Sequence, residues 1–333
     1  MLEKTVARPA AKPTILNLSG VLSAFLSATL LGFTPIFGKL AIQAGLPPFA
    51  VVTIRTVLAT FLMAIALFLT NRRSFFIYPA GLLGCALAGI LNGLGSLFYY
   101  HALSLINANV GQLIFLTYPI FVTVWMLMDR YRLSIISIFR LGLIVTGIGF
   151  LILGFHTPLH LKGVLFMLIA AACYGFHLPI NQRVLFEMPA PTVTFYTLLF
   201  MSLVVAPFGF LAHFPISIGI SFPISFLSLL PVLALALVTF LSRLTLFFGV
   251  KRIGGLQTAL LGITELLVTL AFARIWLHES LNGFQWFGVA LIILSILLLS
   301  VEQPLQRQTS KSSWLHWLQS HVISRQQNPP PLD

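Results

Sequence analysis

The feature that most constrains the fold of this chain is a series of apolar runs that follow one another almost from end to end. Each run has about 18 residues or more, which is long enough to cross about 30 Å of hydrocarbon as an α-helix. Clusters of Gly, Pro, Asn or charged residues separate the runs. The series predicts an all-α integral membrane protein with ten transmembrane helices, at roughly 18–42, 48–70, 77–102, 108–128, 137–154, 162–185, 191–212, 225–250, 254–276 and 284–301.

The composition agrees with a chain surrounded by lipid. Hydrophobic residues make up 58% of the sequence, charged residues make up 8% and the mean hydropathy is +1.00, so too few polar side chains remain to cover a soluble domain. The net charge of +12 comes from small groups of Lys and Arg between the runs rather than from one basic stripe, which argues against a nucleic-acid partner. Cys85 and Cys173 each lie inside an apolar run, so we expect no disulfide framework, metal site or cofactor.

The distribution of basic residues predicts the orientation in the membrane. With the N-terminus in the cytoplasm, fourteen of the nineteen Lys and Arg residues fall on the cytoplasmic side, and only Lys39, Lys162 and Arg274 fall on the other side. Cytoplasmic loops carry the excess of positive charge in membrane proteins. We therefore expect both termini in the cytoplasm and a location in the plasma (inner) membrane.

The two halves of the chain resemble each other weakly in sequence. In the aligned halves Tyr118 stands where the second half has Glu265. The loop that holds Arg72 corresponds to an uncharged loop at 213–223, whereas the uncharged loop at 104–110 corresponds to one with two basic residues, so the charges exchange sides. This exchange predicts two inverted five-helix repeats. The matching segments are LLGFTPIFGKLAI (30–42) with CYGFHLPINQRVL (173–185), and LTYPIFVTV (116–124) with ITELLVTL (263–270).

The repeat divides the chain into four parts. The predicted parts are a cytoplasmic N-tail (1–17), a first repeat (18–155), a second repeat (156–302) and a cytoplasmic tail (303–333). Within that tail, Trp and Leu residues at helical spacing predict an amphipathic interfacial helix over 312–325.

Three prolines lie inside the predicted helices. Pro35 and Pro179 hold matching positions in the two repeats, and Pro119 lies in the fourth helix. Proline removes a helix hydrogen bond and permits a bend, and interrupted helices in matching positions point to the binding site of a transporter. We predict a helix break at each of the three.

With this layout, the chain resembles the drug/metabolite transporter superfamily, of the EamA type. The resemblance covers about residues 18–302, with Arg55 at the family's arginine in the second helix, Glu265 at its glutamate and Glu279 at its closing acidic residue. Leu31 and Leu266 depart from the family's usual tryptophan and proline. The residues that carry the resemblance are GFTPIFGKLAI, PPFAVVTIRTVLATFLM, LFYYHALSLINANVGQLIFLTYPIFVTV and GITELLVTLAFARIWLHESLNGFQWFGVALIILS.

The charged residues inside the helices are the main candidates for a site. A carboxylate at the bilayer centre costs about 2.5 to 3.5 kcal/mol on insertion scales, so Glu265 needs a task or a partner. It can serve as a protonatable coupling group, bind the cationic part of a substrate, or form a structural ion pair. Arg243 is the expected partner of Glu265, with a substrate-carboxylate clamp and a snorkelling side chain as alternatives. For Arg55 we expect an internal structural pairing, against the same snorkelling alternative.

Five uncharged or weakly basic side chains complete the candidates. Asn92 and Tyr99 are seven residues apart, so they share a face of the third helix, which lines the cavity in the family that the chain resembles. His101 lies near the outer end of that helix, so we expect an interfacial residue there rather than a proton relay. His177 lies beside Pro179, where an opened backbone would face the cavity, and Tyr118 could donate a hydrogen bond to a substrate.

The resemblance implies a function. It implies a secondary transporter of small metabolites, or of amino acids, that exports them by alternating access, with protons as a possible coupling ion. The sequence holds no Walker loop, GxSxG elbow or HExxH motif, so we expect neither ATP drive nor an enzyme. The alternatives are an intramembrane enzyme that acts on a lipid-like substrate and a scaffold without transport activity.

Overall fold

The computed structural model describes residues 18–128, 135–153, 160–185, 187–211, 226–253, 258, 261, 263–278 and 281–298, and these residues form helices and short connections. The helices of the first half are α1 (Leu18–Gly32), α2 (Thr34–Gln43), α3 (Pro48–Thr70), the 3-10 helix η1 (Arg72–Phe75), α4 (Pro79–Leu105), α5 (Ala108–Phe115), α6 (Tyr118–Met128) and α7 (Ile135–Leu153). Those of the second half are α8 (Leu161–Leu185), α9 (Ala190–Leu211), α10 (Phe226–Ile253), α12 (Ile263–Trp276) and α13 (Gly283–Leu298).

Seven spans within the described residues are long and apolar enough to cross a membrane, which confirms an all-helical integral membrane protein. Two of them, Leu18–Gln43 and Ala108–Trp125, each combine two helices in line. The other five correspond to α3, α4, α8, α9 and α10. The helices α7, α12 and α13 follow the order of the remaining predicted spans.

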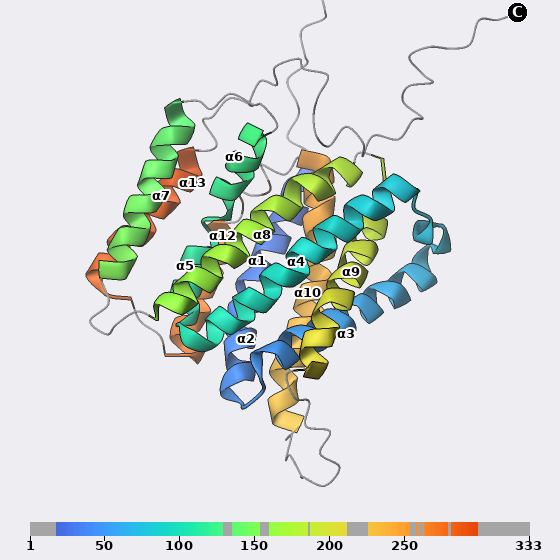
Figure 1. Ribbon diagram of the computed structural model, residues 1–333, viewed down its shortest axis with the longest axis horizontal. Coiled ribbons are helices and arrows are strands. Elements are labelled where there is room, and N and C mark those ends of the chain that lie inside the picture. The colour runs from blue at the N-terminus through green and yellow to red at the C-terminus, as the bar shows by residue number, and fades with distance from the viewer. Residues whose placement is uncertain are drawn as a thin grey trace, which may run out of the picture.

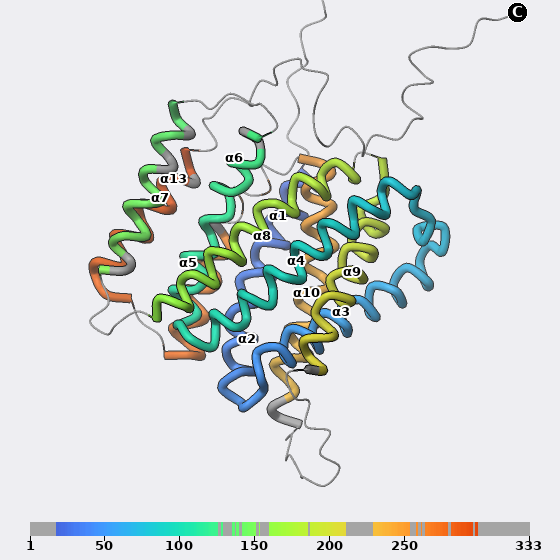
Figure 2. The backbone as a smooth tube through the Cα atoms, in the orientation of Figure 1, coloured from blue at the N-terminus to red at the C-terminus, as the bar shows by residue number. Residues whose placement is uncertain are grey.

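Each of the two combined spans is broken near a proline. Figure 2 shows the backbone path of α1, α2, α5 and α6. α1 ends at Gly32 and α2 begins at Thr34, so Pro35 lies in the first turn of α2. α5 ends at Phe115 and α6 begins at Tyr118, directly before Pro119. Proline fits the first turn of a helix because the N–H group that it lacks has no partner there.

The break predicted at Pro179 is not present. This proline lies inside α8, which continues without interruption from Leu161 to Leu185. One lost hydrogen bond does not end a long helix that neighbouring helices hold on several sides. α4 and α6 both pack against α8.

The helices form one bundle in which α4 lies across the centre, along α8 and α9 (Figure 1). α1 packs along α10, and α3 packs on α9 and α10. α7 and α13 pair with each other at one edge of the bundle. The central helices therefore come from both halves of the sequence and enclose the space where the buried polar side chains meet.

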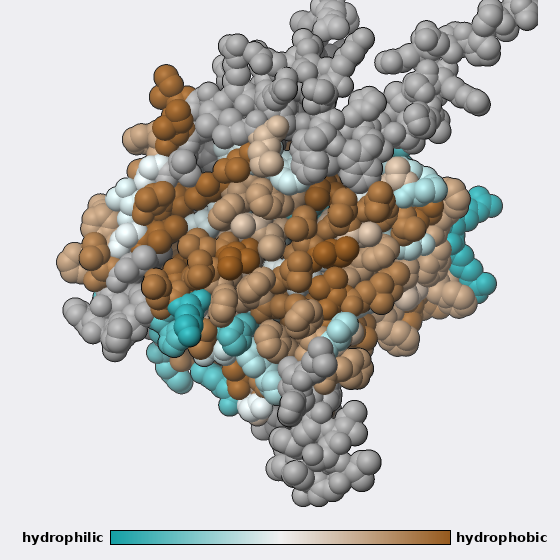
Figure 3. All heavy atoms as spheres, in the orientation of Figure 1, coloured by the Kyte–Doolittle hydropathy of each residue, from teal (hydrophilic) through white to brown (hydrophobic). Residues whose placement is uncertain are grey.

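The outer surface is apolar over most of the face that Figure 3 shows, with hydrophilic patches toward its ends. Large hydrophobic side chains that remain exposed include Leu22, Phe61, Leu203 and Phe287. In water such a surface would be costly, whereas lipid tails surround it without penalty. The predicted tails, the interfacial helix at 312–325 and Glu279 lie outside the described residues.

Candidate functional site

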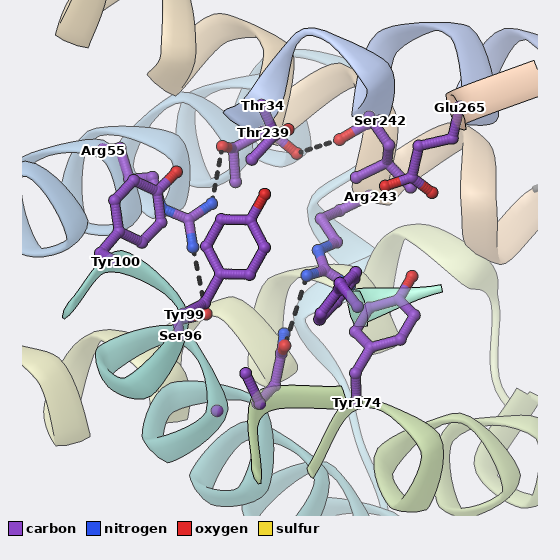
Figure 4. Close-up of a pocket in the computed structure, with 15 residues that line it drawn as sticks. Thr34, Arg55, Ser96, Tyr99, Tyr100, Tyr174, Thr239, Ser242, Arg243 and Glu265 are labelled. Carbon is purple, nitrogen blue, oxygen red and sulfur yellow. Dashed lines mark hydrogen bonds between the residues drawn. The ribbon is translucent and has the colours of Figure 1, made fainter. Parts of the chain in front are cut away.

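A cavity of about 40 Å³ lies at the centre of the bundle. Side chains from both halves of the chain line it, which places it where α1, α4, α8 and α10 meet (Figure 4). Its polar lining includes Arg55, Asn92, Ser96, Tyr99, Arg243 and Glu265. A concave site on which polar groups converge is typical of small-molecule binding.

Glu265 lies in the first turn of α12, where its side chain is only 5% exposed. Nε2 of Gln112 donates a hydrogen bond of 2.7 Å to its Oε1. The backbone of Glu265 packs closely on α1: a Cβ atom added to Gly32 would lie 2.7 Å from the carbonyl oxygen of Glu265. The hydroxyl of Thr269 donates to the carbonyl oxygens of both residues, at 2.8 Å to Gly32 and 2.9 Å to Glu265. These contacts fix the start of α12 against α1.

Tyr99 extends this hydrogen-bonded chain across the bundle. Its hydroxyl donates to Oε1 of Gln112 at 3.3 Å, so Tyr99, Gln112 and Glu265 connect α4, α5 and α12 in one series. Each member of the series is buried. In lipid, polar side chains between helices join them because no water is available as an alternative partner.

Arg243, from α10, lines the same cavity as Glu265 but forms no direct ion pair with it in the described residues. Its Nη2 donates to Oδ1 of Asn92 at 3.3 Å, and its Nη1 faces Nε2 of His177 at 3.5 Å. The guanidinium also lies 5.3 Å from the ring centroid of Tyr174. The predicted pairing of Arg243 with Glu265 is thus replaced by neutral partners, because α4 and α8 place side chains closer to the guanidinium.

Arg55, from α3, lines the same cavity on the other side of Tyr99 from Arg243 (Figure 4). Its Nη1 donates to Oγ1 of Thr239 at 3.2 Å and its Nη2 donates to Oγ of Ser96 at 3.1 Å. Its guanidinium lies 4.8 Å from the ring centroid of Tyr100. The structure thus gives Arg55 internal partners, all neutral, and also makes it part of the cavity wall.

A second, smaller cavity of about 20 Å³ adjoins the first. Leu31, Tyr174 and Glu265 line both cavities, so they stand at the junction between them. Tyr118 and Thr258 line the smaller cavity but not the larger one. A solute that passed between the two cavities would have to pass these three shared side chains.

The structure brings most of the predicted site residues together. Asn92, Tyr99, Arg243 and Glu265 line the larger cavity, and Tyr118 lines the smaller one. His177 and His101 are outside both linings. His177 lies behind Arg243, whereas the ring of His101 stacks on Phe49 at 5.7 Å between centroids, away from the polar cluster.

Several cavity residues were not singled out from the sequence. They are Tyr100, Tyr174, Ser96 and Thr239 in the cavity lining, together with Gln112, which lies behind the lining and donates to Glu265. Two of them had a usable signal: Tyr174 lies in the repeated segment at 173–185, and Gln112 is a polar residue inside an apolar run. Ser96 and Thr239 had no such signal, because serine and threonine are common in membrane helices. Among the described residues, no three His, Cys, Asp or Glu side chains come together as metal ligands.

Comparisons with known proteins agree with this architecture. The model of the EamA-like transporter family matches residues 18–153 and 161–301. An uncharacterized transporter of Synechocystis sp. is 29% identical over 244 residues, which cover 69% of this chain and 69% of that protein. A protein of known crystal structure, 17% identical in sequence, matches this structure with a TM-score of 0.60. The match covers 85% of this chain and 97% of that chain, so the two share the fold.

Proposed function

We propose, on the premise that the chain belongs to the EamA-like transporter family, that it is a secondary carrier which moves small solutes by alternating access. The family assignment and the relative's name point to a membrane transporter rather than to an enzyme. The observation that carries the proposal is the central cavity, with a buried carboxylate at its junction with a second cavity.

The carrier would consist of ten spans in two inverted halves, and reciprocal glycine contacts support this arrangement. A Cβ atom on Gly32 would meet the carbonyl oxygen of Glu265 and the side chain of Val268. A Cβ atom on Gly175 would meet the carbonyl oxygen of Tyr118 and the side chain of Phe121. Gly32 and Gly175 hold matching positions in the two halves, and each contacts matching residues of the opposite half. A two-fold relation between the halves produces such contacts.

A second pair of contacts repeats the relation at the other end of these helices. Gly20 packs against Ile253, with 2.7 Å between its added Cβ and the isoleucine Cγ2. Gly163 packs against Ile106 at the same atom and the same distance. Because each half would contain an odd number of spans, halves related in this way run through the membrane in opposite directions.

Alternating access would use the junction between the two cavities. We place the carrier in the plasma membrane with both termini in the cytoplasm. In this orientation the smaller cavity lies on the cytoplasmic side of Glu265. A solute would enter there and leave through the larger cavity, which makes the carrier an exporter of small metabolites such as amino acids. Glu265, which faces both cavities, would exchange a proton for the solute.

Transport by the purified chain in liposomes tests the proposal. Amino acids and related metabolites loaded inside should exchange with labelled solute outside, and a pH gradient should drive net movement. Glu265→Gln should keep solute exchange while losing the response to the gradient. Net movement that is equally sensitive to pH in Glu265→Gln would remove the coupling role, and absence of any exchange over the panel would remove the carrier.

A further inference from the structure

The larger cavity contains more positive charge than its own side chains neutralise. Arg55 and Arg243 both line it, and their side chains are 4% and 6% exposed. In the described residues neither arginine forms an ion pair with a carboxylate. The side chains that face the two guanidinium groups within hydrogen-bond distance are all neutral. Glu265 receives its hydrogen bond from Gln112 instead. A buried charge without a counter-charge is costly, so it is kept where a task requires it.

The two guanidinium groups also have donors to spare. An arginine side chain offers five N–H donors. Arg55 uses one donor each on Ser96 and Thr239, and Arg243 uses one on Asn92 and faces His177. The Nε atom of each arginine is buried without a hydrogen-bond partner. Buried donors of this kind are normally satisfied, so each guanidinium retains donor capacity for a further acceptor.

Rings and hydroxyls surround the two arginines. In the view of Figure 4, Tyr99 lies between the side chains of Arg55 and Arg243, while Tyr100 lies beside Arg55 and Tyr174 beside Arg243. Arg55 comes from α3 in the first half, and Arg243 comes from α10 in the second half. A group that bound both guanidiniums would therefore hold the two halves of the bundle together across the cavity.

We propose that Arg55 and Arg243 together form an anion subsite, which binds the carboxylate or phosphate group of the transported solute. The planar fork of arginine matches both groups and binds them through paired, charge-assisted hydrogen bonds. This inference rests on the proposed carrier function and names its substrate class: small organic anions or zwitterions. Glu265, at the junction of the cavities, would then remain free for the proton or for an amino group of the same solute.

Thermal unfolding of the full-length protein in detergent tests the subsite without requiring transport. The probes are the twenty amino acids, succinate and glycerol 3-phosphate, each compared with a counterpart that lacks the acid: the amino acid amide, succinamide or glycerol. A ligand that binds only the folded protein raises the unfolding temperature. At least one acid should raise it by a few degrees, and its counterpart should not. The type of acid that acts tells a carboxylate from a phosphate.

The arginine variants assign the effect to the subsite. Arg55→Gln and Arg243→Gln should each weaken binding of the active acid about tenfold or more, because charge-assisted hydrogen bonds are lost. Arg72→Gln should not change it, since Arg72 is exposed and lies over the ring of Phe68. If a glutamine variant does not fold, the lysine variant at the same position keeps the charge and loses the fork, and it should also bind more weakly.

The outcomes separate this inference from the carrier proposal. Equal stabilisation by acids and counterparts, no stabilisation by any acid, or full stabilisation in both glutamine variants would overturn the anion subsite. Exchange of the active acid in liposomes is measured in parallel. Binding without exchange would overturn the carrier and keep the subsite, whereas exchange of only the counterparts would keep the carrier and overturn the subsite.

Discussion

Gln112 donates a hydrogen bond of 2.7 Å to the carboxylate of Glu265 and thereby joins α5 to α12 beside the central cavity. The same amide accepts a hydrogen bond from the hydroxyl of Tyr99, so three helices share one polar series. The partner of the single described carboxylate in the cavity wall is thus an amide and not an arginine. This arrangement orients the carboxylate while it leaves both guanidiniums of the cavity available.

The first prediction concerns this hydrogen bond. Gln112→Leu should lower the free energy of unfolding by about 1 to 3 kcal/mol, because it leaves a buried carboxylate without its donor. Gln43→Leu is the matched control, since Gln43 is exposed at the end of α2 and should have little effect. Thermal unfolding in detergent measures both variants. Equal unfolding temperatures for the two would show that the bond does not stabilise the fold.

The second prediction concerns the close contact between α8 and α6. In Gly175→Ala the new Cβ would lie 2.6 Å from Cβ of Phe121 and 2.8 Å from the carbonyl oxygen of Tyr118, so backbone must move. We expect a loss of about 1 to 3 kcal/mol, typical of an overpacked core. Gly149→Ala, with nothing within 4 Å of its Cβ, should be neutral or slightly stabilising. A Gly175→Ala protein as stable as Gly149→Ala would contradict the close packing.

The third prediction concerns the junction of the two cavities. Leu31→Trp adds a large ring where Leu31, Tyr174 and Glu265 face both cavities, and it should lower the rate of solute exchange at least tenfold by blocking passage. Leu22→Trp places the same ring on the exposed outer side of α1 and should leave exchange unchanged. Exchange rates in liposomes decide between these results. Normal exchange in Leu31→Trp would mean that solute takes another route.

The fourth prediction tests the orientation. Ala44 lies in the exposed connection between α2 and α3, and Arg73 lies in the exposed turn after α3, at the opposite end of the span. In intact cells, a membrane-impermeant maleimide should label Ala44→Cys and should label Arg73→Cys only after permeabilisation. Cys85 and Cys173 are replaced by alanine in both proteins. The reverse labelling pattern would invert the proposed topology and with it the direction of export.

Local features of the chain were predictable from the sequence. Apolar runs of sufficient length form helices in lipid because the backbone must satisfy its own hydrogen bonds there. The breaks before Pro35 and Pro119 also follow from chemistry within one segment, since proline favours a first turn. The isolated position of Glu265 inside an apolar run is enough to mark it as a candidate site residue.

The sequence by itself therefore determined that long apolar segments form membrane helices, where two of them break and that Glu265 is buried. The tertiary structure alone decided that Glu265 meets Gln112, that Arg55 and Arg243 share one cavity, and that α8 continues through Pro179. Helical periodicity defines the faces of one helix, but it does not fix the rotation and depth of that helix against its neighbours. Those two quantities come from packing between helices far apart in the sequence, and they set every partner in the site.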